Sequence, residues 1–146
     1  MGATTICEFF VAGKPIQQGS KTAFVVGGRA VMTDQNHKTL KPWRALVARA
    51  AASAHTGVRL EGALEVVAEF QLERPATVKR QLPTVYPDLD KFVRALLDGI
   101  TQAETVWRDD AQVVSLHASK SYADTPGVLV RISEFQHHPT LEGVTA

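Results

Sequence analysis

The chain of 146 residues has little of what holds secreted or membrane proteins together. Its single cysteine, Cys7, cannot build a disulfide framework, which favours a reducing compartment. No apolar run approaches the roughly 20 residues of a membrane-spanning helix, and the first residues lack the pattern of a signal peptide. We therefore expect a cytoplasmic protein with no membrane association, in which Cys7 is a small buried hydrophobic residue.

Three common metal- or nucleotide-binding motifs are also missing. The five histidines are scattered and form no Cys/His zinc pattern. No glycine-rich segment ends in Gly-Lys-Ser or Gly-Lys-Thr, so there is no Walker loop. The acidic segment that begins at Asp88 does not fit an EF-hand, because Phe92 and Val93 stand where an oxygen ligand and a glycine are required. Any metal or phosphate chemistry must therefore use another arrangement of side chains.

The small net charge of +1 hides an uneven distribution. Residues 1–60 contain eight Lys or Arg residues against Glu8 and Asp34, whereas residues 61–146 contain eight against thirteen Asp or Glu residues. The first half can therefore grip phosphates while the second supplies carboxylates. Alternatively, the two halves neutralise each other across a solvated surface, and charge alone does not separate these interpretations.

Hydrophobic periodicity predicts a single domain over residues 1–136 and a flexible tail over 137–146. The expected fold class is α/β, of the α+β type, with a mixed β-sheet and two main helices packed on it. Strands are expected at 4–12, 63–72, 111–122 and 127–135, a hairpin at 22–33, and helices at 41–54 and 89–101. The proline-rich segment 73–87 has no periodicity and is expected to be a loop.

Three of these elements have a distinct pattern. Gly27 and Gly28 suit the turn of the hairpin because both can adopt positive φ angles. The helix 41–54 is expected to bury Trp43, Leu46, Val47 and Ala50. The strand 63–72 is expected to turn one side inward, with Leu64, Val66, Ala68 and Phe70 on that side.

Four aspartates gather at the ends of two predicted elements. Asp88 and Asp90 flank one residue at the start of the helix 89–101, and Asp109 and Asp110 precede a strand about twenty positions later. If that strand begins beside the start of the helix, one carboxylate of the later pair can approach the earlier pair. Carboxylates about 4 Å apart repel by about 1 kcal/mol in water and by several in a cleft. A divalent cation removes this repulsion, and Mg²⁺ accepts such ligands while leaving room for a phosphate oxygen.

Each pair also has a purely structural explanation. Asp88 can cap the helix while Asp90 complements its dipole. Asp109 and Asp110 can belong to a turn that Trp107 anchors in the core.

The faces of the helix 89–101 favour a functional role. Asp90, Arg94 and Asp98 share one side at intervals of four residues. The apolar residues lie on the opposite side, namely Phe92, Val93, Leu96, Leu97 and Ile100. Arg94, or Lys91 on the adjacent turn, would then offset the charge of a phosphoryl transition state.

The segments PDLDKFVRALLDGITQ and VWRDDAQVVSLHASK, within residues 87–120, resemble the RusA family of Holliday junction resolvases of bacteria and their phages. The resemblance implies that Asp88, Asp90 and Asp110 bind Mg²⁺, with Mn²⁺ as an alternative. It places Arg94 where the family has an important lysine, which keeps the charge but not the ability to donate a proton. Lys120 matches a basic position of the family.

The resemblance also implies a homodimer that resolves four-way DNA junctions by paired symmetric nicks, in recombination and repair. Asp109 and Asp98 would not bind the metal themselves but would lie next to the residues that do. The residues expected to contact DNA are Lys91, Lys120, Lys79 and Arg80, the last two on the loop 73–87. Two alternatives stay open: a recombination accessory protein that binds branched DNA without cutting it, and a flap or fork nuclease with the same chemistry.

Overall fold

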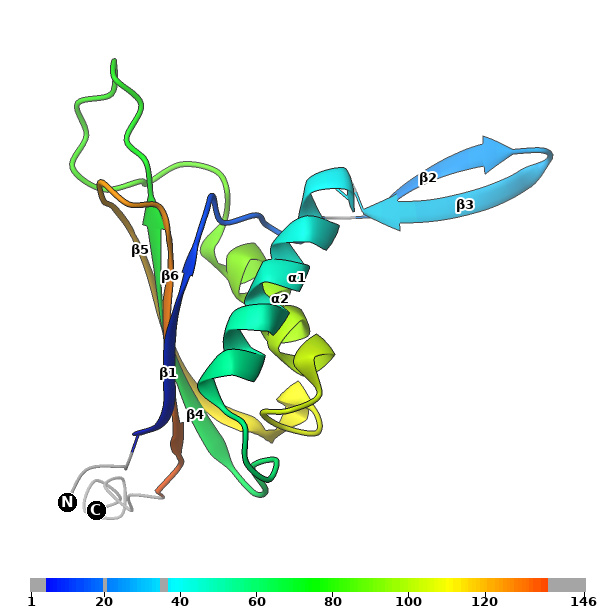
Figure 1. Cartoon of the computed structure of the whole chain (residues 1–146). Coiled ribbons are helices and arrows are strands. Elements are labelled where there is room, and N and C mark those ends of the chain that lie inside the picture. The colour runs from blue at the N-terminus through cyan, green and yellow to red at the C-terminus, as the bar shows by residue number, and fades with distance from the viewer. Residues whose placement is uncertain (1–4, 20, 35–36, 137–146) are drawn as a thin grey trace, which may run out of the picture.

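The computed structural model describes residues 5–19, 21–34 and 37–136, and is organised around a mixed four-stranded sheet with two helices on one face (Figure 1). The strands of this sheet are β1 (Thr5–Ala12), β4 (Leu64–Leu72), β5 (Val113–Tyr122) and β6 (Gly127–Glu134), in the order β1-β6-β4-β5. β4 and β5 are parallel, whereas β6 is antiparallel to both of its neighbours. The predicted fold class is therefore confirmed.

The strand β4 carries the centre of the core. Its inward residues Leu64, Val66, Ala68 and Phe70 are fully buried, as the alternation of the sequence predicts. The ring of Phe70 stacks on that of Phe92 with 5.2 Å between centroids, which joins the sheet to the second helix. Cys7 is also buried, as expected, and burial raises the pKa of its thiol.

The first helix, α1 (His37–Ala54), begins four residues before its predicted start. Its buried residues recur at intervals of three and four and comprise Leu40, Trp43, Val47 and Ala51. The extra turn is stabilised because it brings Leu40 into the core. The predicted stripe was wrong at one position, since Leu46 is 39% exposed.

The second helix, α2 (Leu89–Ala103), packs closely against α1. A Cβ atom at Gly99 would come within 2.8 Å of the side chain of Val47, so only glycine allows this approach. The predicted apolar side of α2 is confirmed for Phe92, Val93, Leu96 and Ile100, and Leu97 is partly buried against the same core.

Between α2 and β5 lies a short 3₁₀ turn, η1 (Asp110–Gln112), where the sequence predicted the first residues of a strand. The remaining elements are the hairpin strands β2 (Lys21–Val26) and β3 (Arg29–Asp34), which project away from the main sheet (Figure 1). Gly27 and Gly28 form the hairpin turn with φ angles of 57° and 81°, as expected.

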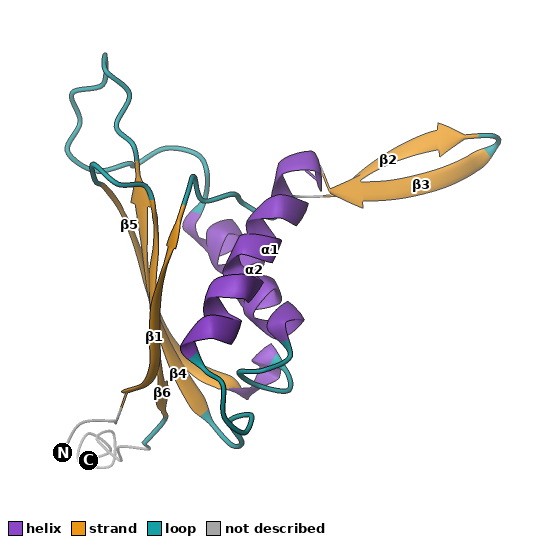
Figure 2. Cartoon of the chain, viewed as in Figure 1, coloured by secondary structure: helices purple, strands orange, loops and turns teal. Residues whose placement is uncertain are grey.

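The segment 73–87 contains no helix or strand, which confirms the predicted loop (Figure 2). The predicted tail 137–146 lies outside the described residues. Among the described residues, no helix is both long and apolar enough to cross a bilayer.

Candidate active site

Asp88 occupies the N-cap position of α2 but does not cap the helix with its side chain. Its backbone is extended (φ −73°, ψ 142°), as in most N-caps, yet the carboxylate accepts no capping hydrogen bond. The carboxylate is 60% exposed and lies 3.9 Å from the ammonium of Lys91. The capping explanation for Asp88 is therefore wrong, and its oxygens are available to a ligand.

The segment that leads into Asp88 is held by Lys120, near the end of β5. The ammonium of Lys120 donates to the carbonyl oxygens of Val85 and Pro87 at 2.7 and 2.8 Å. These bonds occupy two of the three N–H donors of a lysine. Lys120 therefore supports the backbone just before Asp88, in addition to any contact that it makes with DNA.

Asp109 is committed to local structure, as the turn explanation predicted. It is the N-cap residue of η1, and its carboxylate accepts a hydrogen bond from the backbone N–H of Ala111 at 3.4 Å. Trp107 anchors the same turn, because its ring is fully buried and its Nε1 donates to the hydroxyl of Thr101 at 2.8 Å. The turn is therefore fixed to the C-terminal part of α2.

Gln112 is the residue of this region that sequence reasoning missed. Its amide oxygen accepts from the backbone N–H groups of Arg108 and Asp109 at 2.9 and 3.2 Å. Its amide nitrogen donates to the carbonyls of Leu60 and Gly62 at 2.9 and 3.2 Å. The signal that reveals it is the spacing Asp-x-x-Gln, the capping box of a short helix.

Asp110 has a different environment from its neighbour Asp109. Burial raises the pKa of the Asp110 carboxyl, and a hydrogen bond with Asp109 and the charges of Asp109 and Asp98 raise it further. Asp98 itself lies 3.6 Å from the guanidinium of Arg44 on α1. A cation close to Asp110 and Asp98 would relieve their mutual repulsion.

The structure separates the predicted metal ligands within one chain. The first acidic pair, Asp88 and Asp90, lies at the start of α2, where β5 ends. The second acidic pair, Asp98 and Asp110, lies where β5 begins. Asp98 is about 12 Å further along α2 than Asp90, by the rise per residue of a helix. The strand that follows Asp110 thus runs towards the start of α2 and does not begin there. Accordingly, no three His, Cys, Asp or Glu residues of the described chain are close enough to hold a metal ion together.

The donor chemistry of each acidic pair nevertheless suits Mg²⁺. This ion is commonly held by one or two carboxylates, with waters and phosphate oxygens completing its shell. Asp88 has an exposed carboxylate that makes no capping bond and pairs with Lys91 at 3.9 Å, and Asp110 has a carboxylate whose charge is disfavoured by burial and by neighbouring carboxylates. Arg94 lies four residues from both Asp90 and Asp98, is exposed, and forms no ion pair within the described part of the chain.

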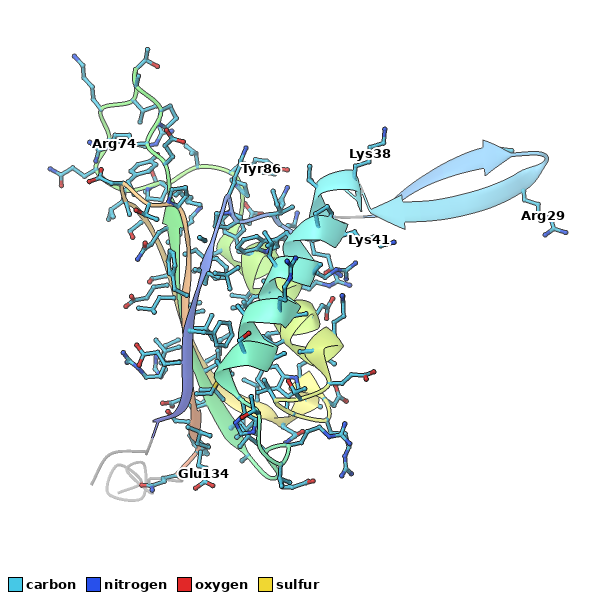
Figure 3. All side chains as sticks on the ribbon, in the orientation of Figure 1. Arg29, Lys38, Lys41, Arg74, Tyr86 and Glu134 are labelled. Atoms are coloured by element: carbon cyan, nitrogen blue, oxygen red, sulfur yellow. The ribbon has the colours of Figure 1, made fainter. Side chains whose placement is uncertain are left out.

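The basic loop 73–87 lies beyond the start of α2, where Figure 3 labels Arg74 and Tyr86. Lys79 and Arg80 are both exposed. Arg80 donates through Nε to the hydroxyl of Tyr122 at 3.1 Å, and the guanidinium of Arg74 stands 5.1 Å from the centre of the same ring. Lys79, by contrast, is exposed and forms no hydrogen bond or ion pair with any other described residue.

Comparison with known proteins relates the sequence of this chain to a family of nucleases. The family model described as endodeoxyribonuclease RusA matches residues 12–133, most of the chain. An uncharacterized protein of Bacillus subtilis (strain 168), YqaN, is 29% identical over 141 residues, which cover 87% of this chain and 95% of that protein.

Proposed function

Because the chain belongs to the RusA endodeoxyribonuclease family, we propose that it is a Mg²⁺-dependent nuclease that resolves four-way DNA junctions by paired symmetric nicks. Residues 1–136 form its single nuclease domain, and its role is in recombination and repair. Three observations support the proposal: the Asp88 carboxylate does not cap α2, Arg94 is exposed on the same helix, and burial and neighbouring carboxylates raise the pKa of Asp110.

The metal ligands in this proposal are Asp88, Asp90 and Asp110. The bound ion would activate water and polarise the scissile phosphate. Arg94 would stand beside the phosphate and offset the negative charge that develops on it. Lys91 and Lys79 would hold the flanking backbone through charge-assisted contacts, which position DNA without reading its sequence.

A homodimer would account for the separation of the two acidic pairs within one chain. Two copies related by a two-fold axis can bring Asp88 and Asp90 of one chain against Asp110 of the other, so that each metal site is shared. A dimer also matches the substrate, because a domain of this size has a radius of gyration of about 15 Å and a four-way junction needs two symmetric cuts.

Cleavage of a labelled four-way junction, with and without Mg²⁺, tests the nuclease function. We expect paired nicks from the native protein only when the metal is present. Asp90→Asn should lower the rate about a hundredfold or more, because a ligand of the metal that activates water and polarises the phosphate is lost. Its binding to the junction should be unchanged or tighter, because a repulsive charge is gone. Asp124→Asn, at an exposed turn outside the site, is the matched control.

Undiminished cutting by Asp90→Asn would overturn the assignment of the site. Junction binding without any nick would instead favour the non-cleaving accessory protein, and would direct attention to Arg94 at the position of the family's lysine. A panel of flaps, forks and four-way junctions, scored for symmetric nicks, separates a resolvase from a less specific nuclease.

Mixing two inactive variants tests whether the metal site is shared between chains. A heterodimer of Asp90→Asn with Asp110→Asn would contain one intact site if each site uses both chains, and none if each site lies within one chain. We expect the mixture to recover single nicks after the subunits exchange, whereas neither variant alone cuts. If the mixture stays inactive while size measurements show heterodimers, the shared site is wrong.

A further inference from the structure

A cavity of about 410 Å³ opens beside Asp88, on the side away from the second acidic pair. It is formed by the loop 73–87, the end of β5 and the start of α2, and Tyr86 and Pro87 belong to its wall. These two residues directly precede Asp88 in the chain. Whatever occupies the cavity therefore lies next to the first acidic pair. Its volume is within the range of pockets that bind small molecules.

The walls of the cavity are mainly apolar. Tyr86, Tyr122 and Phe92 contribute aromatic rings, and five of the seven prolines of the chain also belong to the lining. Tyr86 is 67% exposed, so its ring is accessible from solvent, whereas Phe92 is fully buried. Aromatic walls of this kind suit a planar ring, which gains stacking energy without needing specific hydrogen bonds.

Side-chain contacts hold the cavity in shape before any ligand enters. Lys120 fixes the wall through the carbonyls of Val85 and Pro87. The amide of Gln17 donates to the hydroxyl of Tyr86, and Arg80 donates to that of Tyr122. A pocket ordered in advance loses less conformational entropy when a ligand binds.

The charged residues of the lining indicate where a negatively charged part of a ligand would bind. Lys14 and Arg80 supply two cations, and Glu73 supplies one carboxylate. A phosphate would be attracted to the two cations and repelled by Glu73. The lining thus suits a ligand that combines a planar apolar ring with an attached phosphate, which is the chemistry of a nucleotide.

We propose that this cavity holds an unpaired nucleobase of the DNA next to the bond that is cut, stacked on Tyr86, with its phosphate at Lys14 and Arg80. The inference rests on the proposed function, because it requires branched DNA as the substrate. Bases at a branch point pair and stack less well than those in a duplex, so taking one out costs less there. The cavity would thereby determine how far the branch point lies from the bond that is cut.

A thermodynamic cycle tests the proposal. Binding is measured without divalent metal, so that no DNA is cut, for a four-way junction with normal bases and for junctions with a single abasic site at each position flanking the branch. We expect one abasic position to weaken binding by the native protein about tenfold. Tyr86→Ala should weaken binding to the intact junction to a similar extent. The abasic site should then cause no further loss, because the two changes remove one contact.

Two further variants separate stacking from other effects. Tyr86→Phe retains the ring but loses the hydrogen bond from Gln17, so it should bind more weakly than the native protein but more tightly than Tyr86→Ala. Leu82→Ala removes an exposed apolar residue of the same loop that does not line the cavity, and should bind as the native protein does. Circular dichroism should show the native fold for all three variants, since both side chains are largely exposed.

The outcomes distinguish the cavity from the nuclease function. If Tyr86→Ala binds the intact junction as tightly as the native protein, or if its loss adds to that of every abasic site, the cavity holds no base. The nuclease function would still stand in that case, provided that the native protein cuts junctions with Mg²⁺. If the native protein binds no branched DNA at all, both the cavity proposal and the proposed function are wrong.

Discussion

Two aspartates of this chain occupy the same kind of position and behave differently. Asp88 precedes α2 and Asp109 precedes η1, both with extended backbones at the N-cap. Asp109 accepts a capping hydrogen bond, whereas Asp88 accepts none. In the first motif, Asp88 and Asp90, the side chain of Asp88 is therefore not used as a cap, and Lys120 holds the backbone before it. In the second motif, Asp109 and Asp110, Asp109 serves as a structural group, whereas the pKa of Asp110 is raised.

The largest expected effect is the loss of Gln112, which holds the second motif. Gln112→Ala leaves the N–H groups of Arg108 and Asp109 and the carbonyls of Leu60 and Gly62 without their partner. Since this region is partly solvated, we expect a loss of about 2 to 3 kcal/mol in the free energy of unfolding, measured by urea denaturation.

The matched control for Gln112→Ala is Gln102→Ala, at an exposed position of α2. Its effect on the free energy of unfolding should lie within about 0.5 kcal/mol of zero. Equal stability of the two variants would mean that the four hydrogen bonds of Gln112 do not hold the turn.

The corresponding support of the first motif is Lys120. Lys120→Met removes both bonds to the carbonyls before Asp88, and we expect a loss of about 1 to 2 kcal/mol in stability. The Mg²⁺ concentration needed for half-maximal cleavage should rise, because Asp88 is no longer held in place. Junction affinity should fall only as far as the cavity wall at Val85 and Pro87 is loosened, and its dependence on salt should change little. A clear fall in the salt dependence would instead identify Lys120 as a phosphate contact.

A direct comparison of the two N-caps has a smaller expected effect. Asp109→Ala should cost about 1 kcal/mol, because a capping bond is lost. Asp88→Ala should leave stability within about 0.5 kcal/mol of the native value, because no capping bond exists to lose. If thermal denaturation shows the same loss for both variants, the two aspartates are equivalent caps and Asp88 is not reserved for a ligand.

Much of this arrangement follows from local patterns in the sequence. Alternation identified the buried side of β4, and helical spacing identified that of α2. The position of the two motifs relative to each other could not be predicted in this way. It depends on the parallel pairing of β4 with β5, a contact between distant segments that determines which end of β5 meets the start of α2. Gln112 was missed for a similar reason, since two of its partners lie fifty or more residues away.

The smallest effect, and one that depends on pH, is expected at Asp110. Burial, Asp109 and Asp98 raise the pKa of the folded-state Asp110 carboxyl above its unfolded value, so the folded protein holds this proton more tightly. Stability therefore decreases as pH rises through the raised pKa. Asp110→Asn removes the unfavourable charge and should raise the melting temperature near pH 7. The gain should disappear as pH falls below the ordinary range of aspartate, where both states are protonated.

Magnesium should narrow the same difference in melting temperature. A cation bound at Asp110 stabilises the native protein but not Asp110→Asn, so titration with Mg²⁺ at neutral pH should bring the two melting temperatures closer. Asp124→Asn should show neither the pH-dependent gain nor the response to the metal, because Asp124 is exposed outside the site. A gain in melting temperature for Asp110→Asn that is independent of both pH and Mg²⁺ would mean that the gain does not come from removing the charge of Asp110. A gain that depends on both would link the charge of Asp110 to a metal site. Asp110 would then differ in role from Asp109, whose carboxylate caps η1.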